Sequence, residues 1–300
     1  MTDLTYISLG GGVQSSALLA LSALGMHGVP RADVAIFADT QAEIAATYSW
    51  LDRLAAWSSP RGMPIIRCTR GSLEESALAS GVNNMHGRLP TYTRETVSEP
   101  CPCKTTAPAL PFMACGACGG SGIVESVETG LTSRHCTWNF KIEVVHRAAR
   151  EQMGLVRGQR AKGVVSAVQM LGISTDEAHR MKPSRIEWIT HSYPLIDAGL
   201  SRDDCKRICR EVFGEVPPRS SCYFCPYHSD AYWRWLRDSH PPEYAKAVDF
   251  DARFRLSQPR LRGEVYIHRS MRPLDEAVSA SSAPERGDAF GGECEGVCGV

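Results

Sequence analysis

A run of three glycines, Gly10 to Gly12, stands between a predicted strand and a predicted helix and constrains the fold most. Residues 4–9 are β-branched and aromatic, and residues 15–24 are apolar at helical spacing. A loop that only reverses direction needs one glycine, whereas three allow another molecule to approach the backbone closely. The N–H groups of such a loop, together with the positive end of the helix dipole, form a site suited to phosphate.

Strand and helix patterns alternate along most of the chain. Continuous apolar runs predict buried parallel strands at 32–40 and 63–69, with a helix between them. A helix over 140–154, a strand over 162–171 and an edge strand within 186–196 continue the pattern. The alternation predicts an α/β fold of Rossmann-like (HUP) type, in which helices cover both faces of a mostly parallel sheet.

The overall composition excludes several classes of protein. The chain has 300 residues, 43% of them hydrophobic, which is enough for a sizeable core. Lys+Arg and Asp+Glu both total 33, so a strongly basic nucleic-acid coat is not expected. No run of 18 apolar residues and no signal-peptide pattern is present, so we expect a cytoplasmic protein that makes no membrane contact.

The 12 cysteines indicate metal or redox chemistry, because disulfides are rare in the cytosol. Four of them read CxC–x₁₁–CxxC in a Gly- and Pro-rich stretch over 81–131 that has no amphipathic pattern. Four thiolates at this spacing suit a structural zinc ion, whose binding would supply folding free energy that the loop cannot obtain by burial. A second redox cluster and a loop with spare thiols are the alternatives. The four residues are Cys101, Cys103, Cys115 and Cys118.

The glycine loop resembles the PP-loop motif, SGGxDS, of the ATP pyrophosphatases (adenine nucleotide alpha-hydrolase-like) and of the phosphoadenosine phosphosulfate (PAPS) reductase family. Gly11, Gly12 and Ser15 match the motif, Gly10 replaces its serine and Gln14 replaces its aspartate. An amide cannot hold Mg²⁺ as a carboxylate does, so the metal-assisted role at this point is left open. The cofactor-binding residues that the resemblance implies are Gly10, Gly11, Gly12, Gln14, Ser15, Ser16, Asp39 and Thr40.

Two later stretches resemble other elements of the same family. "FADTQAEIAATYSWL" is similar to its second-strand element, although Asp39 can also be a plain strand end with a helix cap. "GISTDEAHRMK" is similar to a later loop, which implies phosphate binding by Arg180. Asp176 and Glu177 would then hold a metal or cap a helix. The positions matched in the first stretch are Asp39, Thr40, Glu43, Thr47 and Tyr48.

Three cysteines resemble the cluster ligands of iron–sulfur sulfonucleotide reductases. Cys136 precedes a basic helix, and Cys222 and Cys225 form a later CxxC, whereas His135 occupies the place of the family's first cysteine. The resemblance implies a [4Fe–4S] cluster with an open fourth ligand. Cys205 is favoured over His135 as that ligand, and an exchangeable site on one iron is a third option. Zinc at the CxxC and simple burial of Cys136 are the alternatives.

The C-terminal stretch "GGECEGVCGV" is similar to the mobile "ECG" tail of the sulfonucleotide reductases. This implies that Cys294 acts as a nucleophile, with Asp176 and Arg180 as the other catalytic residues. The alternatives are that Cys294 and Cys298 are exposed spare thiols or bind a metal as CxxxC. Cys209, one helical turn from Cys205, is expected in the core.

The resemblance implies an enzyme that binds ATP, adenylates a substrate with release of pyrophosphate, and then transfers sulfur from the cluster or the tail to displace AMP. A nucleic acid (DNA or tRNA) or a nucleotide is the expected acceptor, and a sulfur-donor protein is an expected partner. The first alternative is a sulfonucleotide reductase that takes PAPS or APS as substrate and releases sulfite. The second is a non-catalytic nucleotide- and metal-binding module that recognises nucleic acid.

We therefore expect four parts. Residues 1–80 and 131–200 would form the PP-loop α/β domain, into which the zinc-binding insertion 81–130 is placed. Residues 201–275 would form a helical iron–sulfur and substrate region, since helical patterns run over 201–214 and 229–255. Residues 276–300 would be a flexible tail that carries cysteines.

Overall fold

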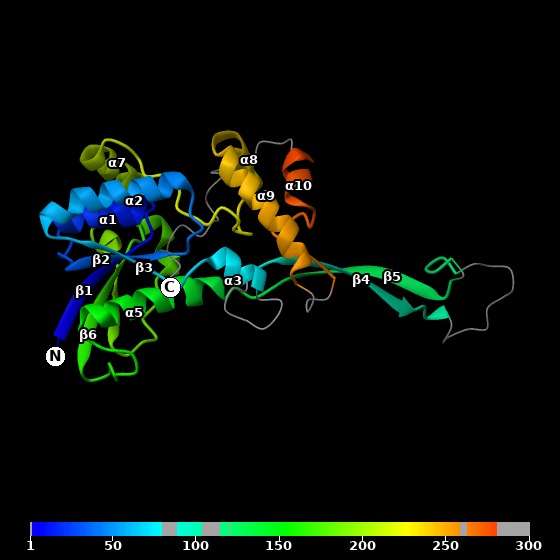
Figure 1. Cartoon of the computed structure of the whole chain (residues 1–300), viewed down its shortest axis with the longest axis horizontal. Coiled ribbons are helices and arrows are strands. Elements are labelled where there is room, and N and C mark those ends of the chain that lie inside the picture. Colours follow the sequence, from blue (N-terminus) through cyan, green and yellow to red (C-terminus); the bar gives the residue numbers. More distant parts are fainter. Residues whose placement is uncertain (1, 80–88, 104–114, 120, 259–262, 281–300) are drawn as a thin grey trace.

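The computed structural model describes residues 2–79, 89–103, 115–119, 121–258 and 263–280, which Figure 1 draws as ribbons. An α/β body carries a group of helices beside it and a long β-hairpin that projects from the molecule (Figure 1). The predicted nucleophile Cys294 and its neighbour Cys298 lie outside the described residues.

The body is built on a five-stranded sheet in the order β3-β2-β1-β6-β7, with every neighbouring pair parallel. The predicted α/β fold class is therefore confirmed. The chain continues from β1 to β2 and β3 on one side of the β1–β6 pair, and from β6 to β7 on the other side. The connections after β1 and β6 therefore run in opposite directions along the sheet. The strands are β1 (Thr2–Leu9), β2 (Val34–Asp39), β3 (Ile65–Thr69), β6 (Val165–Leu171) and β7 (Ile189–Ser192).

Helices cover both faces of the sheet, and β1 shows why. Ile7 and Leu9 belong to the core that faces α1 (Val13–Leu24), α2 (Ala45–Ser58) and α7 (Arg202–Phe213). Leu4 and Tyr6 point the other way, toward α5 (Glu143–Gln152). Because successive side chains of a strand point to opposite faces, β1 contributes to two hydrophobic layers, above and below the sheet in Figure 1. Short helices complete the body: η1 (Ser59–Arg61), η3 (Thr175–Arg180) and α6 (Pro194–Asp197).

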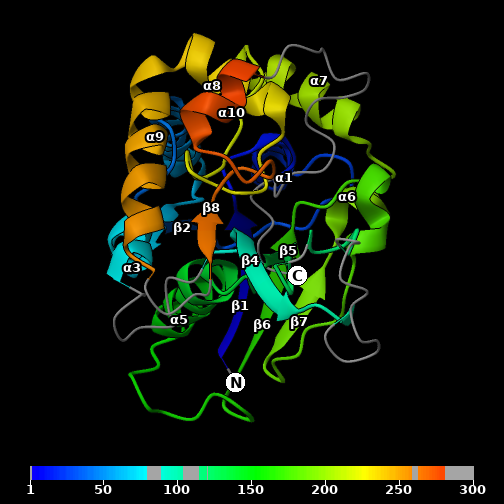
Figure 2. The ribbon, with the colours of Figure 1, turned by 90° about the vertical axis from the view of Figure 1, so that its right-hand side faces the viewer.

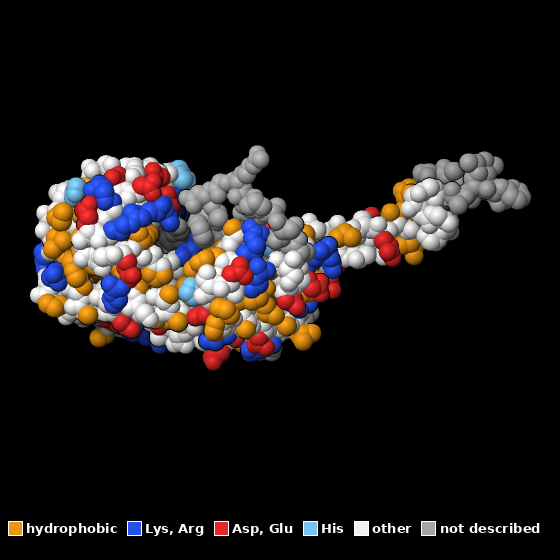
Figure 3. All heavy atoms as spheres, turned by 90° about the horizontal axis from the view of Figure 1, so that it is seen from above, with side chains coloured by type: hydrophobic (Ala, Val, Ile, Leu, Met, Phe, Trp, Pro, Cys, Tyr) orange, Lys and Arg blue, Asp and Glu red, His pale blue; other side chains and the backbone are white. Residues whose placement is uncertain are grey.

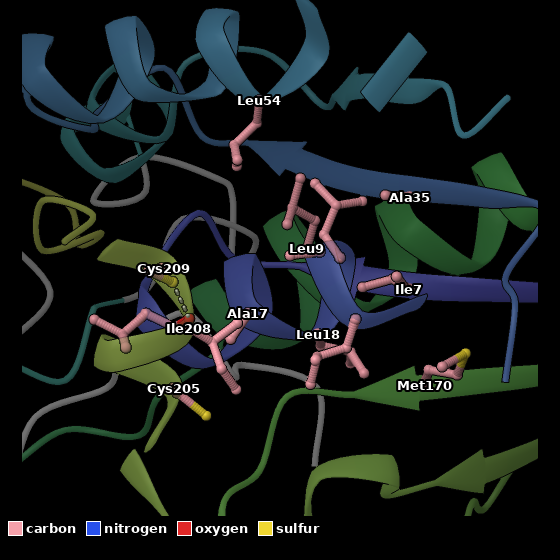
Figure 4. Packing of buried hydrophobic residues seen from close by; sticks show 14 of the residues in the cluster. Ile7, Leu9, Ala17, Leu18, Ala35, Leu54, Met170, Cys205, Ile208 and Cys209 are labelled. Atoms are coloured by element: carbon pink, nitrogen blue, oxygen red, sulfur yellow. Dashed lines mark hydrogen bonds between the residues drawn. The ribbon is translucent and has the colours of Figure 1, made fainter. Parts of the chain in front are cut away.

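The core that faces α1, α2 and α7 is called the upper core here. In it, α7 packs directly against α1. Ile208 packs beside Ala17 and Leu18 in Figure 4, and the Cys209 thiol lies 3.6 Å from the carbonyl oxygen of Val13. Cys209 is fully buried, as expected of a core residue. Packing of this kind fixes α7 beside the start of α1.

A second hydrophobic core holds the C-terminal helices. Phe224, Trp233 and Phe250 are completely buried there, and Phe224 and Phe250 stack with their ring centroids 4.1 Å apart. Figure 2 shows three of these helices gathered above the short strand β8 (Glu264–Tyr266). The helices of this core are α3 (Leu73–Ala79), α8 (Asp230–Ser239), α9 (Pro241–Leu256) and α10 (Leu274–Ala280).

The stretch 81–131 contains a long antiparallel hairpin that its sequence does not predict. β4 (Tyr92–Pro100) pairs with β5 (Ile123–Leu131) along their whole lengths, and β4 also pairs with β8, in the order β5-β4-β8. Nearly all of β5 is exposed, so neither face needs an apolar side chain at every second position. The usual alternation of a half-buried strand is therefore absent from the sequence.

None of the described helices is both long enough and apolar enough to cross a membrane.

The residues at the two ends of α7, Ser201 and Gly214, are of the types that favour helix caps. The Ser201 side chain accepts a hydrogen bond from the backbone N–H of Asp204 at 3.2 Å, and the Asp204 carboxylate accepts one from the Ser201 N–H at 3.0 Å. This capping box satisfies two N–H groups that the helix itself leaves without partners. Gly214 ends the helix in the left-handed conformation, with φ at +84°.

We predict that Ser201→Ala destabilises the protein by about 1 kcal/mol, because the first turn of α7 loses its side-chain acceptor. Urea unfolding followed by circular dichroism measures the change. Ser49→Ala on the exposed face of α2 is the control, with an expected change within about 0.5 kcal/mol. Equal midpoints for both variants would contradict the role assigned to this cap.

Candidate functional site

The glycine loop turns sharply at the end of β1 and leaves the N-terminus of α1 open. Gly11 has φ at +79°, and a Cβ there would lie 3.4 Å from Leu51 of α2. Gly12 is the N-cap of α1, and no side chain in the described part of the chain caps the helix. The first N–H groups of α1 are therefore available to an anion.

The loop after β6 closes one side of this site. A Cβ at Gly172 would lie 2.9 Å from the backbone nitrogen of Ser15, so only glycine lets the two backbones meet there. Gln14 is 4% exposed, and its side-chain nitrogen has no hydrogen-bond partner in the described part of the chain. A buried N–H₂ group without an acceptor is costly, and a bound oxygen-rich ligand would satisfy it.

A cavity of about 280 Å³ opens beside Gly12 and Val13. Its walls come from three separate parts of the chain: the start of α7, the loop over 216–220, and α8. A hollow with Lys and Arg side chains at its rim is visible in Figure 3. The polar and aromatic lining residues are Arg202, Lys206, Arg219, Ser220 and Trp235. Three cations and an indole ring next to a helix N-terminus suit an anion that carries an aromatic base.

The predicted residues at the end of β2 have different neighbours. Asp39 accepts hydrogen bonds from the hydroxyl of Tyr48 at 2.9 Å and from the backbone N–H of Gln41 at 2.7 Å. Burial, followed by the hydrogen bond and charge of Asp39, raises the pKa of Tyr48. Thr40 is buried and lies 3.4 Å from the Cys222 sulfur, so it belongs to the cysteine pocket described below.

The loop after β6 brings Asp176 to the start of α7 and gives Arg180 an internal partner. The Asp176 carboxylate accepts a hydrogen bond from the backbone N–H of Arg202 at 2.5 Å. Arg180 forms an ion pair with Glu177 at 2.9 Å. Asp176 therefore supports the start of α7, and Arg180 would have to leave Glu177 to reach a phosphate.

Three predicted cluster ligands come together in one pocket. Cys136, Cys222 and Cys225 line a small cavity together with Lys141 and Thr40. Burial raises the pKa of Cys222 to about 12 and that of Cys225 to about 11. The pocket therefore disfavours free thiolates and would need a cation to hold them.

The spacing of these thiols tests which metal group they fit. In the described part of the chain, only the four-cysteine group at the hairpin tip has its ligand atoms within 4.8 Å of one another. The thiols of Cys136, Cys222 and Cys225 are thus spread more widely than ligands of one tetrahedral ion. An iron–sulfur cluster binds each thiolate to a different iron atom, so it does not need the sulfurs to lie as close together as a single ion does.

Neither expected fourth ligand is placed among the three thiols. Cys205 lies in the core between α7 and α1, and burial raises its pKa to about 12. It does not line the pocket of the other cysteines, and Figure 4 shows it with the upper core instead. His135 is half-buried beside Cys136, where its ring nitrogen lies 3.0 Å from the hydroxyl of Ser133.

A buried polar network connects the glycine loop with the cysteine pocket. The Ser220 hydroxyl contacts the carbonyl oxygen of Gly10 and lies 3.1 Å from the carboxylate of Glu43. Glu43 pairs with Lys141 at 3.8 Å. Burial raises the pKa of Glu43, and Lys141 acts against that shift. For Lys141, the charges of Glu43 and the cysteines outweigh the opposite effect of burial, so its pKa is raised.

Lys141 was not among the residues that the sequence suggested. It lies five positions after Cys136, in the π-helical turn η2 (Trp138–Ile142), and lines the same pocket. Ser220 was missed as well, although it lies two positions before Cys222. Arg219 and Trp235 belong to a basic and aromatic stretch over 217–244, a composition that suits contacts with phosphates and bases. Arg202 and Lys206 carry no local signal, because only packing brings them to the loop.

The four-cysteine group forms a second centre at the tip of the hairpin. The sulfurs of Cys101 and Cys115 are 3.7 Å apart, and those of Cys103 and Cys118 are 3.6 Å apart. A tetrahedral zinc ion with Zn–S bonds of about 2.3 Å separates its sulfurs by about 3.8 Å. The group is therefore able to bind a metal ion, and its spacing suits zinc. Figure 1 shows that this tip is remote from the α/β body.

Comparisons with known proteins give a likeness among the solved structures. No protein-family model matches the chain, and a search of curated proteins returns no match. Among solved structures, the chain is similar to a phosphoadenylyl-sulfate (PAPS) reductase from Candida auris, solved as a phosphate complex. The two share 14% identity over 71% of this chain and 73% of that chain, with a TM-score of 0.35. The fold class stated above rests on the strand order and not on this likeness.

We predict that the two cysteine centres lose their metals independently. Cys115→Ala should release one zinc ion per chain and leave any visible absorption of anaerobically purified protein unchanged, because the hairpin tip is remote from the pocket. Cys136→Ala should remove that absorption and retain the zinc. Elemental analysis and absorption spectra measure both. Colourless wild-type protein that contains zinc alone would contradict the iron–sulfur assignment.

Proposed function

We propose that this chain is a PP-loop enzyme that binds ATP at the N-terminus of α1, adenylates a substrate and transfers sulfur with the help of a [4Fe–4S] cluster. One observation carries the proposal: a single segment lines both the cation-lined cavity and the cysteine pocket. Residues 216–220 border the cavity beside Gly12, and Ser221, Cys222 and Cys225 border the pocket. A nucleotide and a sulfur-handling centre would then be held next to each other.

The cavity supplies what an adenine nucleotide needs. The open N–H groups of α1 would hold phosphoryl oxygens, and Arg202, Lys206 and Arg219 would neutralise their charge. The Trp235 ring can stack against the base. These three cations would also compensate for the glutamine at position 14. Positive side chains would take over part of the charge neutralisation that Mg²⁺ provides beside an aspartate.

Cys136, Cys222 and Cys225 would hold the cluster. When bound, such a cluster with an exchangeable iron site holds and releases sulfur. Lys141 lies between these cysteines and Glu43, where its charge offsets that of the thiolates. The contacts of Ser220 with Glu43 and Gly10 would hold the cysteine segment beside the glycine loop.

We predict that the protein releases pyrophosphate from labelled ATP in the presence of its acceptor, with a nucleic-acid mixture of tRNA and DNA as the first probe. Sulfite release from labelled PAPS, without pyrophosphate release, would replace the proposal by the sulfonucleotide reductase alternative. Neither product would favour the non-catalytic binding module. The reaction is measured by thin-layer chromatography of the labelled products.

A charge substitution in the cavity tests whether ATP binds there. Arg219→Gln should weaken ATP binding by about 10- to 100-fold, because one charge-assisted hydrogen bond to phosphate is worth about 1.5–3 kcal/mol. Arg210→Gln, on an exposed position near the end of α7, should bind ATP as the wild type does. Calorimetric titration gives both affinities. Equal affinities for the two variants would place the nucleotide outside the cavity.

A further inference from the structure

The hairpin carries an unpaired sheet edge that neither proposed site uses. β5 stands at the end of its three-stranded sheet, and no strand in the described part of the chain pairs with its outer side. Its 9 residues make a strand about 30 Å long. Such an edge presents a row of N–H and C=O groups to any other strand, and proteins usually protect it with lysine or proline. The β5 sequence, IVESVETGL, contains neither.

The same strand exposes a stripe of apolar side chains. Ile123, Val127 and Leu131 are 50%, 61% and 52% exposed. Because successive side chains of a strand alternate between faces, the spacing of four places all three on one face. An apolar stripe along an unpaired edge indicates a surface that another strand covers.

We propose that this edge pairs with β5 of a second copy of the chain, antiparallel, about a two-fold axis at Val127. In this register Ile123 faces the partner's Leu131, and Val127 faces its own counterpart. Glu125 faces the partner's Thr129, and Glu128 faces the partner's Ser126. The apolar stripe is thus matched from end to end, and no two charges of the same sign oppose each other directly.

Neighbouring registers are less favourable for the same residues. An axis at Glu128 would set this carboxylate against its counterpart in the partner. An axis at Ser126 would set Val127 against the partner's Glu125 and Ile123 against the partner's Thr129. Side-chain pairing across the edge therefore selects one register.

The charge of the hairpin disfavours a nucleic acid as the partner of this edge. Glu95, Glu99, Glu125 and Glu128 lie on the two long strands, and their one basic residue, Arg94, is paired with Glu264 at 2.6 Å. On the face seen in Figure 3, hydrophobic and acidic side chains follow the arm beyond its base. A polyanion would be repelled by this surface.

The pairing has a consequence for the cysteine pocket. Ile123 lies at the tip end of the hairpin and Leu131 at its base, so each four-cysteine tip would lie beside the partner's hairpin base. In each chain the residues after Leu131 lead to Arg134 and Cys136, which line that pocket. The metal-binding tip of one copy would thus border the cysteine pocket of the other.

Charge substitutions at the axis test the proposal with the full-length, metal-loaded protein. We expect the wild type to dimerise in sedimentation-velocity experiments. Val127→Glu and Val127→Lys should each raise the dissociation constant by about five- to tenfold, because the new charge opposes itself across the axis. An equimolar mixture of the two variants should regain at least wild-type affinity as a heterodimer. Thr96→Glu is the control: it adds the same charge one strand away from the edge and should dimerise like the wild type.

Several results would overturn the proposal. A wild-type chain that stays monomeric up to its solubility limit would contradict the pairing. Dimers that Val127→Glu leaves unchanged would place the contact elsewhere. A mixture of the two charge variants that associates no better than each alone would rule out a two-fold axis at Val127.

Discussion

The hydroxyl of Ser220 is the contact on which the arrangement of the proposed site depends. It lies between the carbonyl oxygen of Gly10, in the glycine loop, and the carboxylate of Glu43, which stands before α2. Gly10 is half-buried and Glu43 is buried, the single hydroxyl proton serves one of these acceptors at a time, and a buried acceptor without a donor is costly. This need for a donor fixes the segment over 219–222 against the end of the sheet, and with it the positions of Arg219 and Cys222.

The neighbouring ion pair adds a second constraint. Glu43 is almost fully buried, and burial raises its pKa, while Lys141, the Ser220 hydroxyl and the Ser221 backbone act against that shift. Removal of Lys141 would leave a carboxylate without a counterion in the interior. The same ammonium group lies among the three cysteines. The charge of the cysteine pocket and the geometry of the glycine loop are therefore linked through Lys141, Glu43 and Ser220.

The sequence predicts those parts of the structure that local rules control. The parallel strands are continuous apolar runs, and the caps at Ser201 and Gly214 follow from residue type alone. The four cysteines at the hairpin tip were grouped correctly by spacing. The hairpin itself was not predicted, because strands exposed on both faces need no apolar alternation. The cation-lined cavity was not predicted either, since Arg202, Arg219 and Trp235 meet only when α7 packs on α1 and α8 joins the second core. Cys205 is a comparable case: the family resemblance suggested it as a ligand, whereas α7 places its side chain in the core.

The central claim is that a nucleotide binds at the N-terminus of α1, next to the cysteine pocket. A crystal structure of the protein with ATP tests it most directly. We predict phosphoryl oxygens within hydrogen-bond distance of the first N–H groups of α1, and the side chains of Lys206 and Arg219 on the same phosphates. A nucleotide bound elsewhere, with the α1 N-terminus closed by side chains, would contradict the account.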